Sequence, residues 1–272
     1  QDYKEAVKWY RLAADLGNSG AQSNLGFMYE IGQGVPQDYK EAVKWYRLAA
    51  DLGNKRAQYN LGLLYSNGQG VLQDYKEAVK WYKLAADQRY SKAQLNLGYM
   101  YSNGQGVLQD YKEAVKWYRL AADQGNSGAQ YNLGLFYDNG QGVLQDYKEA
   151  MKWYKLAADQ GNSGAQYNLG HMYINGQGVL QDYKEAMKWY KLAADQGYSS
   201  ALNNLGVIYR YGQGVPENHV TAHMYYNLSA YFGNEKALEN RDKLSAEMSS
   251  QDISKAQDMA REWLAEYEKR TK

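Results

Sequence analysis

The feature that most constrains the fold of this chain is a repeat of 36 residues. The string QDYKEAVKWY occurs four times, and a version with Met in place of Val occurs twice more, always 36 residues after the previous copy. The copies begin at Gln1, Gln37, Gln73, Gln109, Gln145 and Gln181, and a degenerate seventh copy, ENHVTAHMYY, begins at Glu217. Self-similarity at one fixed period of this length is typical of stacked repeat arrays, in which each unit contacts only its neighbours.

The first half of each unit is predicted to be an amphipathic helix, from Asp2 to about Leu16 in the first copy. Asp2 is the expected N-cap, and Glu5 three residues later makes an Asp variant of the capping box. Gly17 is expected to end the helix. Apolar residues recur at helical spacing along one face. This face comprises Tyr3, Ala6, Val7, Tyr10, Ala13 and Ala14, widened by Trp9 and Leu12.

The second half of each unit predicts another helix, capped by Asn18 or Ser19. Gly26 lies in its middle, where Gly costs roughly 1 kcal/mol relative to Ala. Because this Gly recurs in every copy, we expect a neighbouring helix to cross closely there. The segment 32–35, Gly-Gln-Gly-Val, is the predicted turn to the next unit, and no segment alternates with the period of a strand. The expected buried stripe consists of Ala21, Leu25, Met28 and Tyr29.

The period ends after Gly233, and two further helices are predicted at Glu235–Met248 and Asp252–Arg270, the second capped by Ser249 or Ser250. The final helix is expected to cover the apolar side of the helix before it and so to cap the array. We therefore expect one continuous domain, with a half repeat at 1–17, six repeats at 18–233 and the terminal helices at 234–272. The apolar side of the final helix contains Ile253, Ala256, Met259, Ala260, Trp263, Leu264 and Tyr267.

The composition narrows the classes of function. The net charge of +1 gives no general attraction to nucleic acid or anionic lipid. The absence of cysteine excludes disulfides and thiolate sites, so either a reducing or an oxidising compartment is allowed. No apolar run approaches the roughly 20 residues of a membrane-spanning helix. The sequence starts at Gln1, inside a repeat and without an initiator Met, and is expected to be a piece of a longer protein.

The order of the recurring residues identifies a family resemblance. Ala, Leu-Gly, Tyr, Gly-x-Gly-Val, Asp, Ala, Trp-Tyr and Ala-Ala recur in this order six times, between Gln1 and Gly233. This pattern resembles the Sel1-like repeat family, relatives of the tetratricopeptide repeat. The resemblance implies an all-α, right-handed α-solenoid superhelix of two-helix repeats with a C-terminal capping helix. It also implies that helices of the 21–31 type line the concave side and helices of the 38–52 type lie outside.

The resemblance implies a function in binding other proteins. Members of the family act as adaptors in bacterial signalling, envelope and host-interaction proteins, and in eukaryotic degradation complexes. We therefore expect a scaffold that binds a protein or peptide segment in its concave groove, with no cofactor. A bacterial source is implied, while cytoplasmic, periplasmic and secreted locations stay open. Some relatives carry one disulfide per repeat, and this chain lacks those cysteines.

Differences among the copies indicate where a partner would bind. The predicted outer helices differ only by Val/Met and Arg/Lys, whereas the inner helices diverge at the positions of Gly20, Ser23, Phe27 and Glu30. Steps of three and four residues place these positions on one helix face. We call this stripe the variable face. Binding to a partner would explain its divergence, and neutral drift at solvent positions is the alternative.

An Asn recurs between these variable positions in all six inner helices. In the tetratricopeptide family, the matching Asn and a basic residue four positions earlier hold a ligand's terminal carboxylate, and Arg56/Asn60 and Lys92/Asn96 have this spacing. The alternative is a structural hydrogen bond between helices, which is favoured for most copies. A basic, aromatic pocket is predicted around repeats two to four. The predicted peptide-binding residues are Arg56, Tyr59, Asn60, Lys92, Asn96, Tyr99, Tyr131, Asn132, Tyr167, Asn168 and His171.

Catalysis has little support in the sequence. The chain contains no Ser-x-x-Lys motif, and its Gly-Gln-Gly turns are not followed by the Lys-Ser/Thr of a phosphate-binding loop. His219 and His223 lie four residues apart on a predicted helix and could share a metal ion. They replace residues of the repeat's apolar face, however, so core or interface histidines are the favoured interpretation. We expect no catalytic residue and no metal site.

The sequence leaves two other functions open, nucleic-acid binding and a purely structural role. Lys4, Lys8 and Arg11 recur on the outer helices and could form a basic ridge for nucleic acid, but each such helix also carries three acidic residues, which cancel the three cations. A passive spacer or a self-associating rod is the stronger alternative, because identical repeats can stack end to end where an array is cut.

Overall fold

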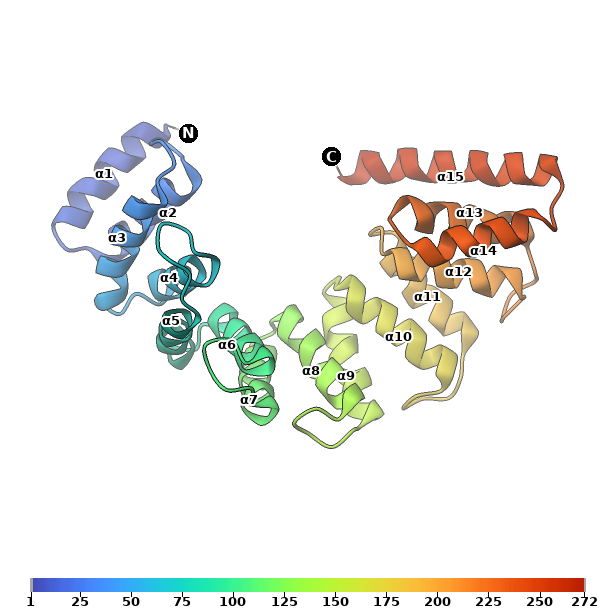
Figure 1. Cartoon of the computed structure of the whole chain (residues 1–272), viewed down its shortest axis with the longest axis horizontal. Helices are drawn as coiled ribbons and strands as arrows, with labels where there is room; N and C mark the ends of the chain where they lie inside the picture. Colours follow the sequence, from blue (N-terminus) through green and yellow to red (C-terminus); the bar gives the residue numbers. More distant parts are fainter. Residues whose placement is uncertain (1, 272) are drawn as a thin grey trace. The chain divides into compact units, whose positions relative to one another are not determined.

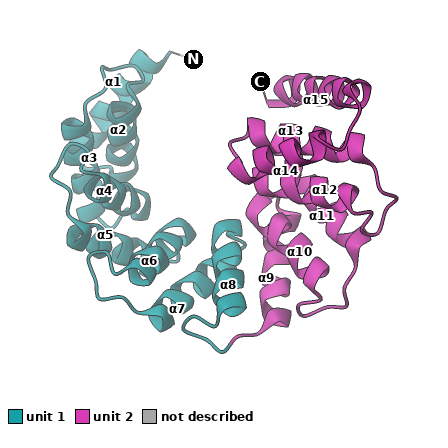
Figure 2. Ribbon diagram, turned by 45° about the vertical axis from the view of Figure 1, so that its right-hand side comes forward, with its two compact units in different colours: residues 1–144 teal, residues 145–272 magenta. Residues whose placement is uncertain are grey.

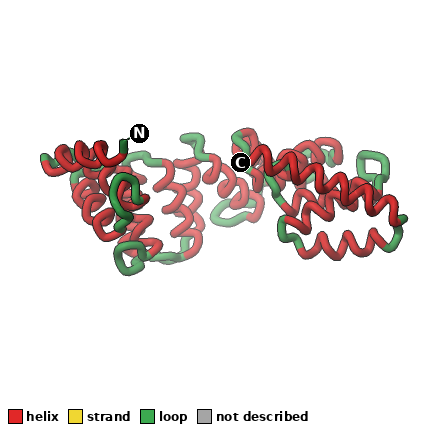
Figure 3. Tube along the Cα trace, turned by 90° about the horizontal axis from the view of Figure 1, so that it is seen from above, coloured by secondary structure: helices red, strands yellow, loops and turns green. Residues whose placement is uncertain are grey.

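The computed structural model describes residues 2–271, so Gln1, the predicted cut edge of the array, and Lys272 lie outside the described residues. The described chain forms fifteen α-helices and contains no strand, as Figure 3 shows in its red and green trace. The predicted all-α solenoid of paired helices, followed by a C-terminal helix, is confirmed.

The chain divides into two compact units, residues 1–144 and 145–272, which are coloured separately in Figure 2. The helices of the first unit are α1 (Tyr3–Asp15), α2 (Ser19–Ile31), α3 (Tyr39–Asp51), α4 (Lys55–Asn67), α5 (Tyr75–Asp87), α6 (Ser91–Asn103), α7 (Tyr111–Ala122) and α8 (Ser127–Asn139). The helices of the second unit, labelled in Figure 1, are α9 (Tyr147–Asp159), α10 (Ser163–Asn175), α11 (Tyr183–Ala194), α12 (Ser199–Arg210), α13 (His219–Tyr231), α14 (Glu235–Ser245) and α15 (Ser250–Thr271).

The predicted helix ends of the repeats are largely confirmed, whereas the helix predicted at Glu235–Met248 ends earlier, at Ser245. The Asp38 carboxylate accepts hydrogen bonds from the backbone N–H groups of Lys40 and Glu41, and Asn54 caps α4 in the same way. The Glu41 side chain forms an ion pair with Lys44, at 3.3 Å. The Asp cap therefore exists, while the Glu of the capping box stabilises the helix through a neighbouring Lys.

The core consists of aromatic residues that bridge successive helices. The Tyr of the Trp-Tyr pair is fully buried from Tyr46 onward, and the Trp packs into the apolar cluster of the preceding repeat. Trp9, with no preceding repeat among the described residues, is 61% exposed, and the Leu12 position is exposed in the first six copies, whereas its equivalent in the seventh, Leu228, is buried. The prediction that Leu12 widens the buried face was therefore wrong, and Tyr29 is only half-buried. Adjacent repeats supply the cover that a single hairpin lacks.

The glycines in the middle of the inner helices are sites of close approach, as predicted. A Cβ placed on Gly98 would lie 2.7 Å from Cδ1 of Tyr118, and the same Tyr ring crosses Gly26, Gly62, Gly170 and Gly206 in their own repeats. Because Tyr118 is buried, its ring has no free space into which it can move. The Gly is therefore required by tertiary packing, in spite of its unfavourable helix propensity.

Gly98→Ala should destabilise the protein by up to about 2 kcal/mol. Overpacking a filled core typically costs about 1–3 kcal/mol, and the better helix propensity of Ala returns roughly 1 kcal/mol. Thermal unfolding measures the change. Gly128→Ala in α8 is the matched control, because its Cβ would meet only side-chain ends at 3.3 Å or more, and it should be neutral or stabilising. A Gly98→Ala protein that melts at or above the wild-type temperature would contradict the packing argument.

The C-terminal helix α15 packs chiefly against α13, two helices earlier, and so corrects the expectation that it covers the helix before it. The apolar side of α15 joins a cluster that contains Met224 and Leu228 of α13. Phe232, just after α13, contacts the rings of Trp263 and Tyr267, at centroid distances of 6.2 and 5.1 Å. The helix begins at Ser250, after Ser249, whose hydroxyl accepts from the Asp252 N–H.

None of the helices between residues 2 and 271 combines the length and the apolar character needed to cross a membrane.

Candidate functional site

The variable face of unit 1 carries exposed cations next to exposed apolar surface. Arg56 and Lys92 lie in the first turns of α4 and α6, both exposed, and within residues 2–271 neither forms an ion pair. Tyr99 lies two turns after Lys92 on the same face of α6 and is 52% exposed. Phe27 occupies the equivalent position on α2 and is 42% exposed. In Figure 2, α2, α4 and α6 follow one side of this unit, while α3 and α5 follow the other.

The predicted site residues are divided between the two units. Eight of them, from Arg56 to Asn132, belong to α4, α6 and α8 of unit 1, and the other three belong to α10 of unit 2. The three in α10 are Tyr167, Asn168 and His171.

The tyrosines at the Ser23 position take part in packing between repeats. The Tyr59 ring lies 5.3 Å from that of Tyr90, and the Tyr167 ring lies 5.1 Å from that of Tyr198. Tyr90 and Tyr198 stand where other copies have the Asn that caps the inner helix, and neither makes a side-chain cap. Tyr59 and Tyr167 are half-buried as a result, like Tyr131. Part of the sequence variation on this face therefore reflects paired changes in packing.

The repeated Asn approaches the buried Tyr of the preceding helix. The Asn204 amide donates to the Tyr190 hydroxyl at 3.1 Å. Burial raises the pKa of Tyr82 to about 12, and hydrogen bonding with Asn96 works in the opposite direction. Burial likewise raises the pKa of Tyr46, and Asn60 opposes this shift. These contacts support a structural role for the Asn. Asn132 and Asn168 are half-buried.

The carboxylate of Glu30, which the sequence marked only as a variable position, accepts from a buried Tyr. The Tyr46 hydroxyl donates to Glu30 at 2.5 Å, and this bond helps burial to raise the pKa of Tyr46. Arg56 is close enough to shift the same pKa downward. Glu30 belongs to α2, which precedes the helix of Arg56 in the chain. Its negative charge therefore offsets part of the positive potential on the N-terminal side of Arg56.

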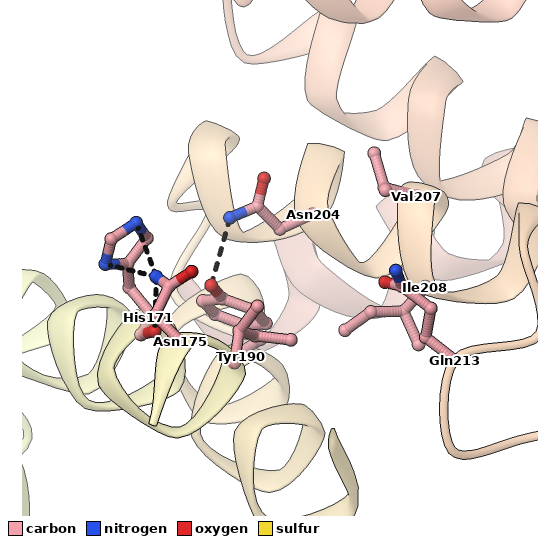
Figure 4. Close-up of a pocket in the computed structure, with 8 residues that line it drawn as sticks. His171, Asn175, Tyr190, Asn204, Val207, Ile208 and Gln213 are labelled. Carbon is pink, nitrogen blue, oxygen red and sulfur yellow. Dashed lines mark hydrogen bonds between the residues drawn. The ribbon is translucent and has the colours of Figure 1, made fainter. Parts of the chain in front are cut away.

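A cavity on the variable face of unit 2 lies between α10 and α12 and has a volume of about 240 Å³ (Figure 4). The Asn175 amide nitrogen lies 3.2 and 3.1 Å from the two ring nitrogens of His171, a position over the ring face. Sequence reasoning identified His171 but missed its neighbours, although Ile174 was visible as a variable position. The lining residues are His171, Ile174, Asn175, Tyr190, Asn204, Val207, Ile208 and Gln213.

His219 and His223 have separate partners. His223 is buried, and its ring nitrogens lie 3.0 Å from the Ser245 hydroxyl and 3.0 Å from the Asn227 amide. Burial lowers its pKa, which favours the neutral ring. His219 contacts Glu217 at 2.8 Å. The core interpretation of His223 is confirmed. Residues 2–271 contain no cluster of three or more His, Cys, Asp or Glu side chains arranged to hold a metal ion.

Comparison with known proteins agrees with this architecture. The model of the Sel1 repeat matches residues 1–18, 19–54, 55–90, 91–126, 127–162, 163–198 and 199–233. The chain is similar to a Sel1 repeat protein from Oxalobacter formigenes, with 37% identity over 84% of this chain and 91% of that one and a TM-score of 0.75. It is also similar to a protective antigen of uropathogenic Escherichia coli, with 30% identity over 98% of this chain and 80% of that one and a TM-score of 0.44. No curated protein sequence matches it. The chain therefore belongs to the Sel1 repeat family, whose α-solenoids generally serve as scaffolds for protein interactions.

Proposed function

We propose that the variable face of unit 1 binds a peptide or protein segment and that the protein acts as an adaptor without catalysis of its own. The observation that carries this proposal is the exposure of Tyr99, at 52%, on the face that also presents the unpaired cations Arg56 and Lys92. Exposed aromatic area beside unpaired cations is typical of binding hot spots. The outer helices differ in part, because one Lys on each of α1, α3, α5, α7, α9 and α11 pairs with the Glu three positions earlier.

The chemistry of this face favours a segment with an acidic side chain or a terminal carboxylate. Arg56 and Lys92 would form charge-assisted hydrogen bonds with such a group. Tyr99 offers flat apolar area that loses little conformational entropy when a partner's side chain packs on it. Asn60 and Asn96 supply amides one turn after the cations, although each also contacts a buried Tyr. The cavity beside His171 is a separate candidate contact within unit 2.

The double variant Arg56→Ala/Lys92→Ala should weaken a true ligand at least about tenfold, because removing hot-spot side chains typically costs at least ~1–2 kcal/mol. Suitable ligands can be selected from a displayed random-peptide library on the wild-type protein and measured by titration calorimetry. The affinity should also depend less on salt in the variant, since two charges are lost.

The matched control is Lys80→Ala/Lys116→Ala, which removes two exposed lysines from α5 and α7 in the same unit. The control should bind selected peptides as the wild type does. Equal affinity of wild type and the Arg56/Lys92 variant, or a larger loss in the control, would place the binding site elsewhere.

Self-association is a second candidate, supported by the exposed apolar side of α1. Trp9 is 61% exposed, and Leu16, two turns later at the end of α1, is also exposed. Light scattering over a concentration series should show a mass above that of the monomer if this face mediates association. Leu16→Ser with Trp9→Ala should then return the protein to a monomer.

A further inference from the structure

Two adjacent repeats carry cations that the other copies lack, at the turn from the outer to the inner helix. Residues 51–56 and 87–92 each contain one Asp and two cations, whereas the matching segments 15–20, 123–128, 159–164 and 195–200 contain one Asp and no cation. The net charge of this turn is therefore +1 in two copies and −1 in four. The cations are Lys55, Arg56, Arg89 and Lys92, all exposed, and we call them the basic edge.

A ring contact joins the two halves of the basic edge. Tyr59, one turn after Arg56 on α4, lies 5.3 Å from Tyr90, which stands between Arg89 and Lys92. The Tyr167–Tyr198 pair in unit 2 has the same packing, at 5.1 Å, but no cation surrounds it, because the equivalent residues are Ser, Gly, Gly and Ser. The packing of the two rings therefore does not require the cations. Nothing else in this packing explains why cations occur at these four positions.

Arg89 has a backbone conformation that is unfavourable for residues other than Gly. Its φ of +59° makes it the one residue other than Gly with positive φ in the described chain. The equivalent residues in the other copies are glycines with φ between +78° and +87°. A side chain adds strain in this region. At Gly53 and Gly125, the neighbouring equivalents, an added Cβ would meet nothing within 4 Å, so a Cβ at this position adds strain without a packing contact of its own.

We propose that the basic edge is a docking surface for an acidic protein segment, which crosses the starts of α4 and α6 and continues onto the variable face. This inference rests on the proposed peptide-binding function and names the class of its partner. Glu30 limits the favourable region on the N-terminal side, since its carboxylate accepts from the Tyr46 hydroxyl and brings a negative charge to the same Tyr whose pKa Arg56 lowers. The acidic groups of the segment therefore lie on the side of α4 that faces α6.

The surroundings favour a peptide over a nucleic acid. Arg89 borders a hollow of about 380 Å³ together with Asp87 and Asp123, which repel an unbroken row of phosphates. The same hollow is lined by Leu120 and by Gln124, whose amide donates to the buried Gln94 at 2.6 Å, and Tyr99 adds apolar area on α6. Four cations are also fewer than the roughly 6–10 phosphate contacts of a strong nucleic-acid site. A segment in which carboxylates alternate with amide and apolar side chains matches this arrangement.

The test restores the residues of the other copies with Lys55→Ser and Arg89→Gly, and leaves Arg56 and Lys92 in place. The probe is a labelled peptide of roughly twelve residues in which Glu alternates with Leu and Ser, measured at low ionic strength, where exposed charges are least screened. The variant should bind it about five- to tenfold more weakly, with a smaller salt dependence. Its melting temperature should rise at the same time, because Arg89→Gly removes backbone strain. A merely destabilised protein would show the opposite change in melting temperature.

Lys76→Ala/Lys112→Ala, on exposed positions of α5 and α7, is the control and should bind the peptide as the wild type does. Unchanged affinity in the Lys55/Arg89 variant would overturn the inference. So would equal binding of a peptide with Gln in place of Glu, or tighter binding of a single-stranded oligonucleotide of equal charge. The affinity of library-selected peptides separates the two proposals. If it depends on Arg56 and Lys92 but not on Lys55 and Arg89, the proposed function is supported and the docking surface at the basic edge is refuted.

Discussion

Trp117→Ala should destabilise the middle of unit 1 by about 3–5 kcal/mol, the usual cost of removing a large buried aromatic residue. Trp117 is 6% exposed and packs into the cluster of the preceding repeat, which includes Tyr82, Leu97 and Met100. Its loss therefore opens a cavity at the interface between two repeats, and in a stacked array the coupling between neighbours determines cooperativity. Hydrogen exchange should show loss of protection in α6 and α7.

Trp9→Ala is the matched control, because it makes the same substitution at the same repeat position where no preceding repeat covers the ring. At 61% exposure, Trp9 should be replaceable at a cost within about 0.5 kcal/mol, as is usual for surface positions. Trp117→Phe should lie between the two, since it also removes an indole N–H that is buried without a partner among the described residues. Similar effects of Trp117→Ala and Trp9→Ala would show that the Trp does not couple the repeats.

Deleting residues 252–272, the length of α15 from its first turn onward, should uncover α13 and cause association or fraying of the C-terminal repeats. Met224, Leu228 and Phe232 lie under α15. Burial of each such side chain is worth on the order of 1.5–3 kcal/mol, so exposing them together removes most of the stability of the last repeat. Light scattering and hydrogen exchange of α12 and α13 measure the two outcomes.

A shorter deletion, of residues 269–272, is the control, because it leaves Trp263 and Tyr267 in contact with Phe232. That protein should stay monomeric and melt at the wild-type temperature. If the long deletion behaves in the same way, α15 is not a cap.

Much of the fold was predictable because the same local signals for helix ends and apolar faces recur in every repeat. The Asp and Asn caps, Gly17 and the apolar spacing each determine one helix end or face through contacts within a few residues. Even Gly26 was informative, since a costly residue that recurs in the same place indicates a close crossing, and the structure shows Tyr46 there. The error at Leu12 has a physical cause, because periodicity shows which residues share a face but not where a neighbouring helix ends.

By itself, the sequence determined the number, order and ends of the helices and the residues on the variable face, because these follow from local capping and spacing. Only the tertiary structure showed that the Tyr59 ring packs against Tyr90, that Asn96 hydrogen-bonds with Tyr82, and that Glu30 accepts from Tyr46. It also placed α15 on α13 and left Arg89 in a strained conformation. These facts depend on contacts between residues of different helices, and on φ angles, which no one-dimensional pattern records.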